Sequence, residues 1–134
     1  MLINNSEIDI QHLSFEPALK RGITLAVLRL DKIHPIISGN KLFKLHYFLQ
    51  KAITGKTKKI ITSGGAYSNH LVATAYACKI NGLDSIGLIR GEKPSILSHT
   101  LQQCIVYGMQ LKFISRNKYR DKYYPGHLFY RHKL

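Results

Sequence analysis

The chain has 134 residues, of which 45% are hydrophobic, so a single globular domain fits the composition better than general disorder. Its formal net charge of +13 excludes an acidic protein and raises the question of an acidic partner. Because the sequence shows no secretory signal, membrane-length apolar run, metal-ligand spacing or disulfide framework, we expect a reduced, cytoplasmic protein without a membrane partner or a metal.

Hydrophobic periodicity predicts strands that alternate with helices along the chain. The expected strands are residues 23–30, 58–63, 85–90 and 110–115, and the expected helices are 40–53, 68–81 and 98–107, with a last helical turn or two from 116 to about 123. The first helix should bury one apolar stripe, formed by Leu42, Leu45, Phe48, Leu49 and Ile53. This alternation indicates an α/β fold in which helices flank a twisted parallel sheet in three layers.

The stretch "SGGAYSNH" follows the strand at 58–63, so it should lie at the carboxyl end of the sheet, where open α/β sheets bind ligands. Its glycines permit positive φ and a close approach of ligand to backbone. Free N–H groups at the next helix start favour an anion, while Ser68 adds a hydroxyl and Asn69 an amide. The alternative is purely structural: Gly64 and Gly65 make a tight turn, and Ser68 caps the helix.

A second stretch, "SGNKLFKL" at residues 38–45, places Lys41 and Lys44 three residues apart, on one helical face. If apolar side chains surround these lysines, lost hydration and mutual repulsion favour the neutral amine. A neutral amine is what a Schiff base with an aldehyde cofactor requires. The alternative is two solvated lysines on a helix exterior.

Taken together, "SGNKxxKL" and "GGxxSNH" resemble the pyridoxal-phosphate enzymes of the 1-aminocyclopropane-1-carboxylate deaminase and D-cysteine desulfhydrase family. The segment "RLDKIHPIISGNK" is similar to the stretch that leads to that family's lysine, although Leu30 and Lys32 depart from the pattern. The resemblance runs from about residue 12 to 123. It implies a partial tryptophan-synthase-β-like fold, whose members bind pyridoxal 5'-phosphate between two α/β domains.

The resemblance also implies a role for individual residues. Lys41 matches the lysine that forms the Schiff base and transfers protons, and Asn69 matches the amide that holds the phenolic oxygen of the cofactor. Ser68 matches the hydroxyl that contacts the substrate carboxylate, and Asn40 and Lys44 match supporting positions. His70 follows Ser-Asn where desulfhydrases of the family often carry histidine, which favours β-elimination from D-cysteine over deamination of the cyclopropane amino acid.

Members of that family continue into a second domain, which supplies the phosphate loop and the group at the pyridine nitrogen. Neither is found here. We therefore expect residues 1–38 to lead to the lysine, 39–123 to form a small α/β domain, and 124–134 to be an irregular basic tail. This organisation predicts a truncated chain, or one half of a split protein, with weak cofactor binding and little or no activity alone. Expected partners are a small amino acid, a separately encoded second half or another copy of the chain.

A different function remains open for the basic end. Residues 112–134 interleave lysines and arginines with tyrosines and Phe129, a composition that could bind nucleic acid or another acidic partner. The structural interpretation is a solvated helix face followed by an irregular tail. No nucleic-acid motif accompanies the charge, so the sequence favours the structural interpretation.

Overall fold

A three-stranded parallel sheet organises the protein, and the computed structural model describes residues 8–55 and 57–120. The sheet has the order β3-β4-β5, formed by β3 (Lys59–Gly64), β4 (Asp84–Arg90) and β5 (Met109–Ile114). In this register Thr62 lies beside Gly87, and Gly87 lies beside Leu111. The predicted mixed α/β fold, with a parallel sheet flanked by helices, is therefore confirmed.

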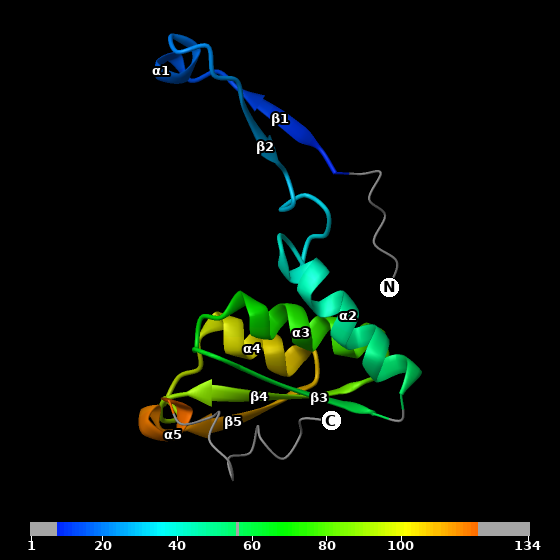
Figure 1. Ribbon diagram of the computed structural model, residues 1–134. Coiled ribbons are helices and arrows are strands. Elements are labelled where there is room, and N and C mark those ends of the chain that lie inside the picture. Colours follow the sequence, from blue (N-terminus) through cyan, green and yellow to red (C-terminus); the bar gives the residue numbers. More distant parts are fainter. Residues whose placement is uncertain (1–7, 56, 121–134) are drawn as a thin grey trace.

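The three longer helices lie on one face of the sheet (Figure 1). They are α2 (Lys41–Thr54), α3 (Asn69–Ile80) and α4 (His99–Val106), each within one or two residues of its predicted bounds. The short α5 (Arg116–Arg120) follows β5. Because Ile60 packs on the helix side and side chains alternate along a strand, Ser63 faces the opposite side. There the Tyr119 hydroxyl of α5 donates a hydrogen bond to Ser63 Oγ over 3.4 Å.

Two groups of buried side chains hold the helices to the sheet. One joins α3 and α4 to the strands through Leu71, Val72, Ala75, Ile89, Leu101, Cys104 and Met109. The other packs α2 on α3 through Ile37, Leu42, Leu45, Leu49, Ala73 and Ala77. The prediction for the α2 stripe is wrong at Phe48 and Ile53, which are 64% and 49% exposed. The buried stripe continues instead through Ala52, because that position follows the face that contacts α3.

A hairpin precedes this body and projects away from it (Figure 1). We call it the arm: β1 (Ile10–Leu13), α1 (Glu16–Leu19) and β2 (Leu25–Leu28). The two strands are antiparallel, with Ile10 opposite Leu28. The strand predicted at 23–30 is confirmed in its centre, whereas β1 and α1 were not predicted. No helix among residues 8–55 and 57–120 combines the length and the apolar character needed to cross a membrane.

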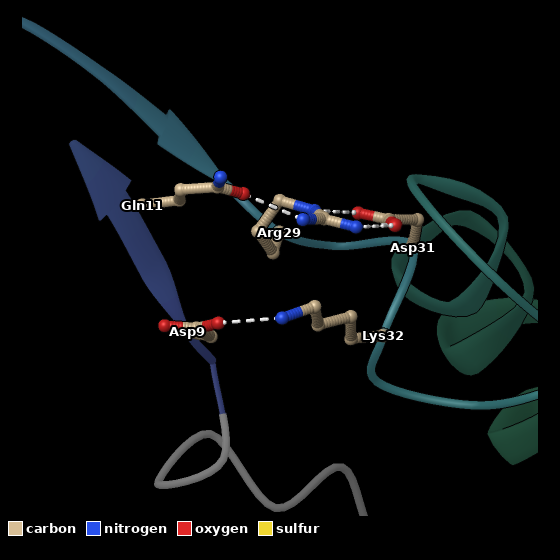
Figure 2. Close-up of polar contacts among 5 residues, drawn as sticks. All are labelled: Asp9, Gln11, Arg29, Asp31 and Lys32. Atoms are coloured by element: carbon tan, nitrogen blue, oxygen red, sulfur yellow. Dashed lines mark hydrogen bonds and ion pairs between the residues drawn. The ribbon is translucent and has the colours of Figure 1, made fainter. Parts of the chain in front are cut away.

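Polar contacts fix the base of the arm (Figure 2). Arg29 donates two hydrogen bonds to Asp31, at 2.9 and 2.7 Å, and a third to the Gln11 side chain at 2.6 Å. The hydrogen bonds from Arg29 lower the pKa of Asp31 to about 2. Lys32 pairs with Asp9 over 2.9 Å. Lys32, which departs from the family pattern, thus has a structural partner in the arm.

We predict that Leu101→Ala lowers the free energy of unfolding by about 2–5 kcal/mol, because Leu101 is fully buried between α4 and the sheet. Ile105→Ala on the same helix is the matched control: Ile105 is 50% exposed, so its loss should change the stability by less than about 0.5 kcal/mol. Urea unfolding followed by circular dichroism measures both values. Equal losses for the two variants would contradict the described core.

Candidate active site

The loop between the arm and α2 positions Lys41, the first residue of α2, in the body of the protein. His34 Nδ1 accepts hydrogen bonds from the backbone N–H groups of Ile36 and Ile37, both at 3.0 Å. Ile37 is fully buried and anchors the loop in the core. Gly39 closes the loop by donating its N–H to the Leu30 carbonyl over 2.8 Å, and its φ of 64° favours glycine at this position. These hydrogen bonds and the burial of Ile37 therefore hold the "IHPIISG" segment in place before the start of α2.

Lys41 is the first residue of α2 and is half-buried. Its Nζ donates a hydrogen bond to the Asn40 side-chain oxygen over 2.8 Å. Lys44, one turn later, is exposed. The expectation that apolar side chains surround both lysines is not met at Lys44, because Leu42 and Leu45 are buried against α3 instead.

The two glycines at the end of β3, Gly64 and Gly65, differ in how closely they are packed. A Cβ on Gly64 would lie 2.8 Å from Ser68 Cβ and 2.9 Å from Leu71, so only glycine permits this close packing. A Cβ on Gly65 would meet nothing within 4 Å. Neither residue has the positive φ that the sequence suggested. Gly64 therefore serves the turn itself, whereas the space beside Gly65 is available to a ligand.

Ser68 occupies the N-cap of α3, and Asn69 is the first residue of that helix. The Ser68 side chain makes no capping hydrogen bond, unlike Ser98, whose Oγ accepts one from the Leu101 N–H at the start of α4. The Ser98 hydroxyl also donates to the Ala66 carbonyl and so ties the turn to α4. Asn69 is exposed. Ser68 thus occupies the cap position without a side-chain capping hydrogen bond, and its hydroxyl and the Asn69 amide lie beside a helix N-terminus.

His70 connects the two predicted motifs. Its Nε2 lies 2.9 Å from the Thr62 hydroxyl of β3. Burial lowers the pKa of His70, and the charges of Lys41 and Lys44 lower it further. His70 and Lys44 line the same cavity, so the first turn of α2 lies near the first turn of α3. Within the part of the chain that the structure describes, no hydrogen bond joins Lys41 directly to Ser68 or Asn69.

A cavity of about 470 Å³ opens between α2 and β3. Lys44, His70 and Thr62 line it together with apolar side chains such as Leu45 and Phe48. The sequence did not single out Thr62, Thr74 or Ser98. Ser98 could have been found from the sequence, because a serine directly before a helix is a common N-cap. No sequence signal marks Thr62, because its contact with His70 depends on the packing of α3 on β3. The predicted tail at 124–134 lies outside the described residues.

We predict that His70 titrates below the ordinary histidine range and that Lys44→Ala raises its pKa, because the substitution removes a nearby positive charge. A carbon-proton NMR titration of the imidazole signals measures both values. Because the folded pKa lies below that of the unfolded chain, this group should reduce stability as the pH falls through the unfolded value of about 6.5. An unchanged His70 pKa in the Lys44 variant would contradict the described geometry.

The chain is similar in sequence to known proteins. No protein-family model matches the chain. A Thermotoga maritima protein, provisionally named a 1-aminocyclopropane-1-carboxylate deaminase, is 34% identical over 117 residues, which cover 85% of this chain and 37% of that protein. The bifunctional D-cysteine desulfhydrase/1-aminocyclopropane-1-carboxylate deaminase of Arabidopsis thaliana, a mitochondrial protein, is 32% identical over 109 residues, covering 77% of this chain and 27% of its own length.

A solved structure supports the same grouping. The crystal structure of a 1-aminocyclopropane-1-carboxylate deaminase homologue matches with a TM-score of 0.66 at 32% identity, over 81% of this chain and 32% of that one. The chain thus spans roughly a third, or less, of the proteins it matches. It belongs to the family of 1-aminocyclopropane-1-carboxylate deaminases and D-cysteine desulfhydrases, and it corresponds to one part of those longer proteins.

Proposed function

We propose that the chain supplies one half of a pyridoxal-phosphate site that acts on a small amino acid, with D-cysteine as the favoured substrate. One observation carries the proposal: Lys44 of the first motif and His70 of the second line one cavity, because α2 packs on α3. Two motifs that resemble one family's cofactor site, and lie far apart in the sequence, are therefore neighbours in the fold. His70 favours D-cysteine over the cyclopropane amino acid, the alternative substrate.

The donor groups at this site suit the cofactor. Pyridoxal phosphate, when bound, supplies an electron sink for charge that develops on the substrate. The Lys41 amine, positioned by Asn40, can hold the cofactor aldehyde and move a proton. Asn69 can donate its amide to an oxygen on the ring, and the Ser68 hydroxyl, which caps no N–H group, can bind a carboxylate. The imidazole of His70 can accept or donate a hydrogen bond, and burial, which lowers its pKa, favours its uncharged form.

We expect the chain alone to bind the cofactor weakly and to have little or no activity. It spans about a third of the length of its relatives, so any cofactor contacts made by the rest of their length would be absent when this chain is assayed alone. Charge-assisted hydrogen bonds to a phosphate are strong, so their loss should weaken cofactor binding. Orientation of reacting groups is worth about 7–11 kcal/mol in catalysis, and Lys41, Ser68 and Asn69 provide only part of that constellation.

We predict that pyridoxal phosphate forms a weak adduct with the chain, which borohydride reduction traps on Lys41. Mass spectrometry of the digested protein locates the modified residue. Lys41→Ala should abolish this adduct, whereas Lys44→Ala, the matched control on the same helical face, should leave it in place. An adduct of equal yield in the Lys41→Ala variant would show that Lys41 does not correspond to the family's Schiff-base lysine.

We further predict that the purified chain releases no measurable sulfide or pyruvate from D-cysteine, because Lys41, Ser68 and Asn69 alone hold neither the phosphate nor the pyridine nitrogen of the cofactor. A coupled assay for the 2-oxo acid, with an intact relative as positive control, measures the rate. Robust turnover of either substrate by this chain would contradict the proposed half-site.

A further inference from the structure

A hydroxyl group on β3 holds the imidazole of His70. The Thr62 Oγ1 atom lies 2.9 Å from His70 Nε2, and both residues are half-buried in the wall of the cavity between α2 and β3. Thr62 shares the helix-facing side of β3 with Ile60, because side chains alternate along a strand. Within residues 8–55 and 57–120, no other hydrogen bond reaches the His70 ring. This contact therefore decides which ring nitrogen is left for a ligand.

The direction of this hydrogen bond follows from the donors and acceptors of the two side chains. A neutral imidazole has one N–H donor and one acceptor nitrogen, whereas a hydroxyl can act as either. If Nε2–H donated to Thr62, both the hydroxyl hydrogen and the acceptor at Nδ1 would lack a partner among the described residues. If the hydroxyl donates to Nε2, only the Nδ1–H lacks one. Partly buried polar groups without partners cost free energy, so the second arrangement is favoured.

The cavity around the ring suits the Nδ1–H that this arrangement leaves. Lys44 and Lys51 line the cavity, and their ammonium groups donate hydrogen bonds without accepting any. Among the described residues that line it, none has an acidic side chain. A ligand with an anionic oxygen, such as the carboxylate of an amino acid, would supply both the acceptor for the Nδ1–H and the complementary charge.

We propose that Thr62 is a positioning residue, whose hydroxyl donates to Nε2 of His70, fixes the tautomer that carries the hydrogen on Nδ1, and so presents a donor rather than an acceptor to the ligand. Thr62 acts on the ligand through His70. The identity of that ligand as an amino acid rests on the proposed function, whereas the hydrogen bond and the tautomer do not.

Nitrogen-15 NMR of the histidine rings tests the proposal on the full chain without cofactor. Spectra are recorded at about pH 8, above the ordinary histidine pKa of about 6.5, so that the rings are uncharged. The signals missing from a His70→Gln variant assign the ring. Protonated and unprotonated ring nitrogens have well-separated shifts, and the expected result for the unchanged chain is a protonated Nδ1. Thr62→Val should move the ring toward the Nε2–H form, which a histidine side chain prefers in water.

Two further variants serve as controls. Thr62→Ser keeps the hydroxyl and should retain the Nδ1–H form. Thr74→Val removes a hydroxyl from the same cavity, but Thr74 donates to the backbone carbonyl of His70 over 2.8 Å, so the ring tautomer should stay unchanged. Because valine suits a strand, circular dichroism should show that the Thr62→Val variant keeps its fold.

A protonated Nε2 in the unchanged chain would overturn the proposal, and this result depends on no variant. An unchanged tautomer in Thr62→Val, or an equal change in Thr74→Val, would overturn it as well. The Lys41 adduct tests the proposed function separately. If the adduct forms while Thr62→Val has no effect on the ring, this inference fails and the proposed function stands. If the Thr62-dependent tautomer is found without an adduct, the reverse holds.

Discussion

The packing of α2 on α3 decides where Lys41 lies. α2 precedes the sheet in sequence and is not one of the crossovers between its strands, so no strand fixes its position. Ala73 and Ala77 on α3 are buried and small, and they let Leu42 and Leu45 of α2 pack closely against that helix. This contact, together with buried Ile37 in the preceding loop, holds the first turn of α2 beside α3.

Neighbouring residues hold the turn after β3 in place. Gly64 allows the turn to pack against Ser68, and Ser98 ties the turn to α4 through the Ala66 carbonyl. These residues hold the backbone in place. The Ser68 side chain makes no capping hydrogen bond, and our proposal assigns its hydroxyl and the Asn69 amide to ligand binding. Such a rigid turn at a helix N-terminus is well suited to bind an anionic group without rearrangement.

Much of the body could be predicted from the sequence, because strands and helices there follow strong periodic patterns. The strand predicted at 58–63 and the helix predicted at 68–81 are both present within one residue of their predicted bounds. In the arm, only β2 was predicted; β1 was missed because it is four residues long and exposed along its whole length, so it carries no alternating burial signal. The His70–Thr62 contact and the exposure of Lys44 depend on tertiary packing, which local patterns do not encode.

One measurement tests most directly whether the two motifs form a single site. Pyridoxal phosphate can be titrated into isotope-labelled protein while nitrogen-proton correlation spectra are recorded. The account predicts that the backbone signals of residues 65–70 and the Asn69 side-chain amide shift together with signals at the start of α2, and that Lys41→Ala removes both sets of shifts. Shifts confined to exposed lysines such as Lys58 and Lys59, with none in the 65–70 turn, would contradict it.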